Sequence, residues 1–277
     1  MKRICILTTV RNDTLFLRKW IDYYGAAFGR ESLFVILDGY DQPKPTDSEG
    51  VNFITLPHTP LKRVPAMRRR AQVMSHFAKG LFKYFDIAIA TDVDEFIVLD
   101  PSVGDDLGAY LSSVNSRTSM SSLGLDVAQH IGEEPPLDPS KPFLQQRSYA
   151  HLSSRYTKPN ITFRPLTWGS GMHRIKGQNF HIDPSLYLFH FGMVDYKLAT
   201  GKTGDKDRLA TGWGEHLSRR ETVFKIVSEA TPKEGDSFFD KARKQQTWRR
   251  PIYALNKPAM MKSKPVVTIP ERFRTIV

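Results

Sequence analysis

Residues 86–96 read DIAIATDVDEF, an apolar run that ends in three carboxylates within four residues. The run is too short to span a membrane and too apolar for a surface loop, so we interpret it as a strand buried on both faces. Because side chains alternate along a strand, Asp92 and Asp94 are expected to leave its end on the same side. Two like charges repel each other unless a cation lies beside them, and a hard divalent ion with oxygen ligands is the obvious candidate. The alternative is that these acids cap the next element or keep a loop soluble.

Strand and helix signals alternate along the first half of the chain. This pattern is typical of a mostly parallel sheet that is covered by helices on both faces, and the predicted fold class is therefore α/β. Strands are expected at 4–10, 32–37, 53–56 and 86–91, with helices after Asn12-Asp13 and from Pro65. Functional sites of such sheets lie beyond the carboxyl ends of the strands, which is where Asp92 and Asp94 stand.

Beyond residue 100 the periodicity loosens, and a less regular second half is expected. The predicted elements are a helix at 105–114, a strand at 120–128, a surface loop at 133–142, loops and short strands over 143–185, a final strand at 186–194 and a helix at 213–229.

Length and composition place the chain among globular proteins. It has 277 residues, 40% of them hydrophobic and 25% charged, which allows a sizeable core. No stretch approaches 18 apolar residues, and the first ten residues become polar too soon for a signal peptide. The single cysteine, Cys5, lies in the first apolar run and is expected to be a core residue in a reducing compartment. We therefore expect a cytoplasmic protein.

The charge of the chain is strongly basic and unevenly placed. Forty Lys and Arg residues against 29 acidic residues leave a formal net charge of +11, which favours a polyanionic partner. Residues 241–264 hold eight Lys/Arg and no acid, interleaved with aromatic residues and methionines. The alternatives for this segment are a solvated tail, a peripheral contact with the anionic inner face of a membrane, and a nucleic-acid contact. Three prolines argue against one continuous amphipathic helix, and we do not expect nucleic acid because no recognisable binding motif is present.

Polar residues follow the first two predicted strands. Thr8, Val10, Arg11 and Asn12 lead directly into a helix, whose N-terminal amides favour anions while the side chains can hold a base or ribose. Asp38 ends the second strand, where it could accept hydrogen bonds from a ribose or a nucleobase. The alternative for each of these residues is simple capping.

Basic residues at the start of the helix from Pro65 are candidates for a phosphate contact. Of the run 68–70, Arg69 or Arg70 is expected to reach a phosphate, while the others are solvated.

A second chemical element lies about a hundred residues after the acids. His190 stands in the middle of an apolar strand, where a lone histidine is usually a satisfied core residue. With Asp92 and Asp94 it makes an incomplete shell for Mn²⁺, and diphosphate oxygens could fill the open positions. Lys197 follows seven residues later and could neutralise the same diphosphate. His173 and His181 are looser candidates for contacts with an acceptor sugar.

These motifs together resemble the GT-A-fold glycosyltransferases, and most closely family-2-like bacterial enzymes. The resemblance rests on the first strand with Arg11-Asn12-Asp13 and on residues 91–96 (TDVDEF), and more weakly on residues 155–197. It implies that Asp94 ligates Mn²⁺ or Mg²⁺, and that Asp92 contacts the ribose or a metal-bound water. The segment from His190 to Lys197 is similar to a late element of some retaining enzymes, in which the histidine completes the metal shell and the lysine holds phosphate, although the spacing differs.

The resemblance also implies a domain organisation and a substrate class. We expect residues 1–115 to bind a nucleotide sugar, most simply a UDP-sugar, and residues 116–235 to bind the acceptor and complete the metal site, with 236–277 as a basic extension. The acceptor is expected to be a glycan or a lipid-linked molecule, as in the synthesis of cell-surface polysaccharide. A retaining enzyme needs no base, whereas an inverting enzyme needs one to deprotonate the acceptor, and Asp126 or Asp195 is the candidate. Either could equally be a loop acid.

Two other classes of protein remain as alternatives. A strand followed by Asp-x-Asp also resembles haloacid-dehalogenase-like phosphatases, with Asp92 as the nucleophile and Asp94 as the acid/base. In those enzymes the motif follows the first strand, whereas here three predicted strands precede it. A non-enzymatic polyanion-binding protein would explain the charge but would leave the three acids unexplained.

Overall fold

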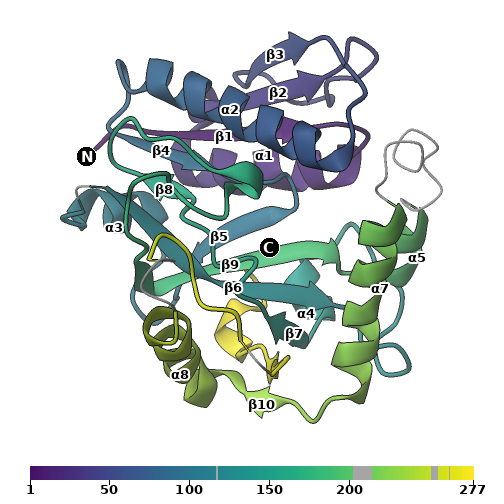
Figure 1. Cartoon of the computed structure of the whole chain (residues 1–277). Helices are drawn as coiled ribbons and strands as arrows, with labels where there is room; N and C mark the ends of the chain where they lie inside the picture. Colours follow the sequence, from purple (N-terminus) through teal and green to yellow (C-terminus); the bar gives the residue numbers. More distant parts are fainter. Residues whose placement is uncertain (117, 202–213, 251–254, 262) are drawn as a thin grey trace.

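The computed structural model of the chain describes residues 1–116, 118–201, 214–250, 255–261 and 263–277 (Figure 1). Its first half is the α/β unit that the sequence predicts. The strands β1 (Ile4–Val10), β2 (Leu33–Asp38), β3 (Asn52–Leu56) and β4 (Ile87–Ala90) lie in the order β3-β2-β1-β4 and are all parallel. The helices α1 (Thr14–Phe28) and α2 (Arg63–Leu81) connect them.

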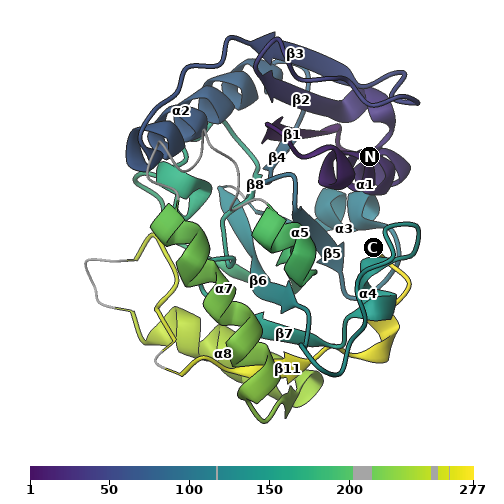
Figure 2. The ribbon, with the colours of Figure 1, turned by 90° about the vertical axis from the view of Figure 1, so that its right-hand side faces the viewer.

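The central strand β1 is buried on both faces, which is why it begins with four apolar residues, ICIL, in succession. Ile4 and Ile6 belong to the core cluster that contains the aromatic residues of α1, whereas Cys5 and Leu7 belong to the cluster that contains Met74 of α2. Figure 2 shows the two helices on opposite sides of these strands. The alternation of side chains along one strand therefore builds both layers of the fold.

The second half is a mixed sheet that continues the first. Its central strands are β5 (Glu95–Leu99), β6 (Ser119–Ala128) and β9 (Ile182–Met193), and β9 lies antiparallel to β5 and parallel to β6. The short strand β8 (Ile161–Thr162) pairs antiparallel with both β4 and β6, so the described strands form one eleven-stranded sheet. The predicted α/β fold, a mostly parallel sheet flanked by helices, is confirmed, with antiparallel strands added in this half.

The remaining elements cover the second half and close its edge. The described helices are α3 (Leu107–Ser113), α4 (Phe143–Gln146), α5 (Tyr196–Gly201), α7 (Gly214–Glu229) and α8 (Gly235–Trp248). The strands β7 (Tyr149–Leu152), β11 (Val266–Thr268) and β10 (Lys233–Glu234) follow β6 in this order, so β10 forms the edge of the sheet. Short 3₁₀ turns lie at Arg30–Ser32, Ser170–Met172 and Glu271–Phe273. Of the helix predicted at 213–229, Trp213 lies outside the described residues.

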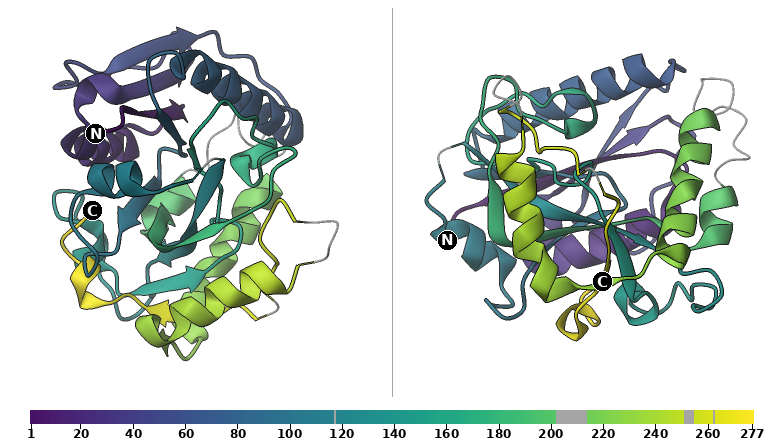
Figure 3. Two further views of the ribbon diagram at one scale, coloured as in Figure 1. Left: turned by 90° about the vertical axis from the view of Figure 1, so that its left-hand side faces the viewer. Right: turned by 60° about the horizontal axis from the view of Figure 1, so that its bottom comes forward.

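The C-terminal segment differs from the prediction made for it from the sequence. The predicted strand at 186–194 is not the final strand, because β11 pairs with β7 and β10 later in the chain. Phe273 is fully buried, and Arg272 forms ion pairs with Asp100 and Asp236. Figure 3 shows the C-terminal residues beside α8. Residues 266–277 are therefore an integral part of the fold, and the solvated-tail interpretation is wrong for α8, whose inner face is buried.

No helix in the part of the chain that the structure describes is both long enough and apolar enough to cross a membrane.

Candidate functional site

Asp92 and Asp94 lie in a turn between two strands, and Glu95 directly follows the turn. β4 ends at Ala90 and β5 begins at Glu95, so the turn lies at the carboxyl end of β4 beside the end of β1. Aromatic residues of α1 hold both sides of it. Trp20 donates a hydrogen bond to Thr91 Oγ1 (2.9 Å), and the Tyr24 hydroxyl donates to the carbonyl of Glu95 (3.2 Å). Because both rings are fully buried, the turn is fixed to the core.

The sheet register places His190 beside two carboxylates. His190 lies opposite Glu95 on β5 and opposite Asp126 on β6. Its Nδ1 is 2.6 Å from Asp126 Oδ1, and its Nε2 is 3.3 Å from Asp94 Oδ2. His190 and Asp126 are almost completely buried. A carboxylate oxygen at this distance accepts a hydrogen bond from the imidazole, so Nδ1 is the nitrogen that donates to Asp126 and Nε2 is the nitrogen that faces Asp94.

This arrangement corrects the role predicted for Asp126. Its carboxylate faces His190 and does not line the cavity described below, so it has no access to an acceptor hydroxyl. A carboxylate behind an imidazole is instead the usual partner of a metal-binding histidine, because it fixes the tautomer and the ring orientation. We therefore regard Asp126 as a residue that positions His190.

A buried lysine that the sequence analysis missed neutralises the other two acids. Lys158 Nζ lies 2.5 Å from Glu95 Oε1 and 2.9 Å from Asp92 Oδ2, and Arg70 approaches the second Asp92 oxygen at 2.5 Å. Burial alone would raise the pKa of Asp92, but the charges of Arg70 and Lys158 lower it. Burial likewise raises the pKa of Glu95. Asp92 is thus held between two cations.

The segment that carries Lys158 is fixed to two strands. Gly124 on β6 permits a close approach, since a Cβ atom there would lie 2.5 Å from the backbone nitrogen of Thr157. Asn160 donates from its side chain to the carbonyl of Ala90 on β4 (2.6 Å). The same segment stacks Tyr156 on the His190 ring, with 3.8 Å between ring centroids. Nothing in the local sequence of residues 153–160 signals these contacts, because every partner is distant in the chain.

A cavity of about 930 Å³ opens over this cluster. Nine of the sequence-predicted site residues line it, namely Val10, Arg11, Asn12, Asp38, Arg69, Arg70, Asp92, Asp94 and His190. Its volume is that of a typical small-molecule site. In all, the described residues that line the cavity include seven Lys or Arg and four Asp side chains, some of them among the nine just named. This excess of positive charge suits an anionic ligand.

The strand ends form one wall of the cavity. Arg11 donates to the carbonyl of Asp38 (2.8 Å) and to both carboxylate oxygens of Asp41, so it ties the ends of β1 and β2 together. Asn12 adopts a left-handed φ of 53°, and its backbone and side chain both bond to Gln42. Asp38 lies 3.1 Å from His58 Nδ1. These polar groups offer donors and acceptors for a base or ribose.

Two predicted site residues lie away from the cavity lining. Thr8 is fully buried within β1, and its neighbour Thr9 lines the cavity instead, because successive side chains point to opposite faces. Lys197 is exposed on α5 and is not among the lining residues. Neither residue is in a position to hold the diphosphate in this structure.

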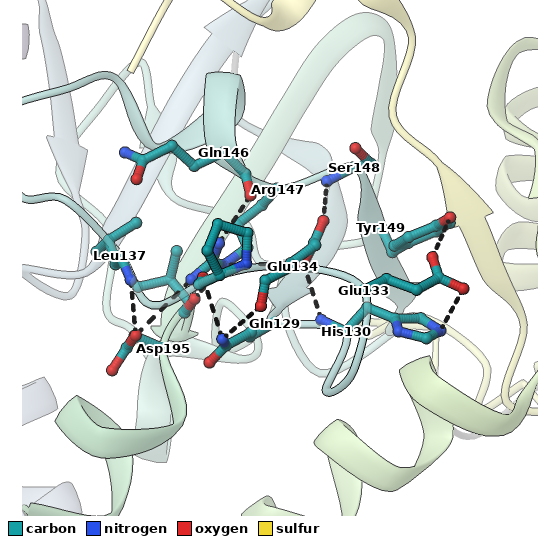
Figure 4. Close-up of polar contacts among 12 residues, drawn as sticks. Gln129, His130, Glu133, Glu134, Leu137, Gln146, Arg147, Ser148, Tyr149 and Asp195 are labelled. Atoms are coloured by element: carbon teal, nitrogen blue, oxygen red, sulfur yellow. Dashed lines mark hydrogen bonds and ion pairs between the residues drawn. The ribbon is translucent and has the colours of Figure 1, made fainter.

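Asp195, the other predicted base, caps a helix. Its Oδ1 accepts a hydrogen bond from the backbone nitrogen of Leu198 in the first turn of α5 (2.9 Å), and its Oδ2 accepts from that of Leu137 (2.9 Å). The buried Arg147 lies 3.7 Å away (Figure 4). The carboxylate is therefore engaged in positioning α5, and it does not line the cavity.

Arg147, which lies beside Asp195, also contacts the predicted surface loop at 133–142. The side chain of Glu134 is 8% exposed and accepts hydrogen bonds from the backbone nitrogens of His130 (2.8 Å) and Ser148 (2.6 Å), as Figure 4 shows. Burying a carboxylate is costly unless it is paired, and Arg147 lies 3.9 Å from it. One acid of a loop that reads as solvated thus points inward.

Of the two looser histidine candidates, His173 and His181, one lines the cavity and the other does not. His173 lines the cavity, and its Nδ1 contacts the carbonyl of Arg155 (3.0 Å). Burial lowers the pKa of His173 to about 4, so the ring is neutral at neutral pH. His181 is exposed and is not among the residues that line the cavity.

The residues present fit a divalent ion held partly by substrate. Among the described residues, no group of three or more His, Cys, Asp and Glu side chains converges as a complete metal site does. Asp92 is turned toward Arg70 and Lys158, whereas Asp94 Oδ2 and His190 Nε2 lie 3.3 Å apart at the cavity, so these two groups are the protein ligands that an ion there would have. Mg²⁺ and similar ions are commonly bound by one or two protein groups together with substrate phosphates.

Comparison with known proteins does not assign a family. No family model matches the chain, and no curated protein matches it. Among solved structures, the chain is similar to a mannose-1-phosphate geranyltransferase from Thermus thermophilus, with 8% sequence identity, a TM-score of 0.27, and coverage of 95% of this chain and 75% of that chain. A similarity at this level carries no argument about function.

Proposed function

We propose that this protein is a metal-dependent glycosyltransferase that moves a sugar from a nucleotide-diphosphate donor, most simply a UDP-sugar, to a glycan or lipid-linked acceptor. The observation that carries the proposal is the contact chain Asp126–His190–Asp94 beside a basic cavity at the strand ends. It offers an oriented imidazole and a carboxylate to one ion, next to cations that can hold phosphate. The α/β fold places this cluster where such sheets bind ligands.

In this proposal each group has a distinct task. Asp94 and His190 would hold Mn²⁺ or Mg²⁺, which when bound offsets the negative charge that develops on the departing diphosphate. Arg69 lines the cavity near the predicted phosphates, and Val10 to Asn12 with Asp38 would hold the nucleoside. Asp92 would contact the ribose from its fixed position between Arg70 and Lys158. Neither Asp126 nor Asp195 reaches the cavity, so the proposal assigns no base.

The exposed basic segment supports a further part of the proposal, a peripheral membrane contact. In the described part of residues 241–264, Trp248 is 81% exposed and Met260, which lines the cavity, is 69% exposed. An exposed indole and thioether among Lys and Arg side chains suit the headgroup region of an anionic bilayer. Loss of partition onto phosphatidylserine-containing vesicles in Trp248→Ala would support this contact. Unchanged partition would contradict it.

The phosphatase alternative finds no support in the geometry. Its nucleophile would be Asp92, but both oxygens of that carboxylate are paired with cations, one of them from a buried lysine. A nucleophile in such an enzyme must approach its phosphate freely.

Calorimetric titration with UDP and GDP, each with and without Mn²⁺, tests the proposal. We expect metal-dependent binding of one nucleotide to the wild type, and loss of that binding in Asp94→Ala and His190→Gln. Asp86→Asn is the matched control, because Asp86 precedes the same strand at its opposite end, where it accepts a hydrogen bond from the backbone nitrogen of Arg3 (2.8 Å) that the side-chain oxygen of Asn can also accept. If neither nucleotide binds with any divalent metal, the proposal is wrong.

A further inference from the structure

Two cations line the cavity without a bonding partner among the described residues. Arg155 and Lys257 are both exposed, and neither forms an ion pair or a side-chain hydrogen bond within that part of the chain. Arg155 precedes Tyr156, the residue that stacks on His190. Ser154 Oγ lies 3.5 Å from Met260 Sδ, which brings the segment that contains Lys257 alongside. Both cations therefore belong to the His190 side of the cavity.

The other cations of the cavity are engaged. Arg11 is bonded to Asp41, Arg69 donates to the carbonyl of Thr59 (2.9 Å), and Arg63 lies against Met67. Arg70 and Lys158 are committed to the acid turn, as described above. Arg155 and Lys257 thus differ from the other cavity cations, because neither side chain is paired with a carboxylate or hydrogen-bonded to an acceptor within the described part of the chain.

The carboxylates of the cavity wall come from the strand ends. Asp13, Asp38, Asp92 and Asp94 lie at or just after the ends of β1, β2 and β4, and Asp92 and Asp94 already contact Lys158 and His190. The described lining segments 154–158, 192–199 and 257–260 contribute no acidic residue to the cavity. They contribute Tyr156, Met193 and Pro258 instead. These segments therefore add to the cavity wall apolar surface and two cations, Arg155 and Lys257, that pair with no described group.

We propose that Arg155 and Lys257 form an acceptor subsite for an anionic group, a phosphate or a carboxylate carried by the acceptor sugar. This inference rests on the proposed glycosyltransferase function. The donor diphosphate would have the ion at Asp94 and His190 as its counter-charge, so two further cations of the cavity wall that pair with no described group match a second anionic ligand. Charge-assisted hydrogen bonds from Arg and Lys would fix the anion, while the ring of Tyr156 lies against the sugar.

The test compares three sugars that differ in charge. Binding of glucose 6-phosphate, glucuronate and glucose is measured by ligand-observed NMR titration, with protein saturated with the diamagnetic ion Mg²⁺ and with UDP, or with GDP if that is the nucleotide bound. We expect one or both anionic sugars to bind more tightly than glucose, and their relative affinities separate a phosphate site from a carboxylate site. Arg155→Gln and Lys257→Gln should each weaken the anionic sugar about fivefold, the upper value for one exposed ion pair. Arg249→Gln, an exposed cation outside the cavity lining, is the control.

The outcomes separate the two proposals. Absence of binding of both UDP and GDP to the wild type contradicts the glycosyltransferase function, and this inference falls with it. If UDP binds but Arg155→Gln and Lys257→Gln weaken UDP as much as the anionic sugar, the two residues belong to the donor phosphate site. Equal affinity for the three sugars, or no detectable binding of any, also overturns the acceptor subsite. Retained UDP affinity with a selective loss of the anionic sugar supports it.

Discussion

Replacement of Lys158 by Met tests the central electrostatic feature of the site. The Lys158 side chain is 3% exposed and lies between Glu95, which is completely buried, and Asp92. Met has similar volume but no charge, so the variant leaves Glu95 without a counter-ion. Removing one partner of a buried ion pair costs about 3–5 kcal/mol, because the remaining charge stays desolvated. Asp92 keeps Arg70, and we therefore expect a loss of about 3 kcal/mol in the free energy of unfolding.

Urea denaturation followed by tryptophan fluorescence measures this loss. Lys141→Met is the matched control, because its side chain is 63% exposed and lies 3.6 Å from Asp138. An exposed pair of this kind contributes about 0–1 kcal/mol. The double variant Lys158→Met/Glu95→Gln should regain part of the stability, since the second substitution removes the uncompensated charge.

Two results would refute this reasoning. The first is a Lys158→Met variant whose free energy of unfolding lies within the range of the Lys141→Met control. The second is a double variant with Glu95→Gln that is no more stable than Lys158→Met alone, because the cost would then come from packing and not from charge.

Three further predictions concern the rest of the molecule. Asp126→Asn should weaken Mn²⁺ binding about 10–100-fold by releasing the His190 ring, and titration by electron paramagnetic resonance checks this; unchanged affinity would contradict the positioning role. Gly124→Ala should cost about 1–3 kcal/mol in urea denaturation, because its methyl group would meet the backbone beside Tyr156. Burial raises the pKa of Asp100, but hydrogen bonds from Arg272 and Ser102 outweigh it and lower the pKa to about 2, so these contacts stabilise the fold above about pH 4 and their contribution is lost as the pH falls toward 2. Wild type should therefore exceed Arg272→Gln by roughly 2 kcal/mol at pH 7, with the difference shrinking in acid; a difference independent of pH would be evidence against this assignment.

The parallel half of the fold follows from local sequence alone. A strand buried on both faces must be apolar throughout, and a helix that covers it must repeat its apolar residues at helical spacing. The apolar stretches within 4–10 and 86–91, ICIL at 4–7 and IAIA at 87–90, meet the first condition, and β1 and β4 appear within one residue of the predicted bounds. The position of the Asp92–Asp94 turn at a strand end is equally local, so the sequence located the candidate site.

The partners of these acids depend on the tertiary structure. His190 and Asp126 are separated by 64 residues, and Lys158 and Glu95 by 63. No local pattern states which acid faces which cation, because the register of β5, β9 and β6 decides it. The same holds for residues 266–277, whose composition reads as a basic extension until β11 pairs with β7. The sequence by itself determined the apolar strands and the acids at their ends, since those depend on neighbours in the chain. Only the fold decided which acid positions His190, which is held by cations and which caps a helix, since those roles depend on contacts between distant segments.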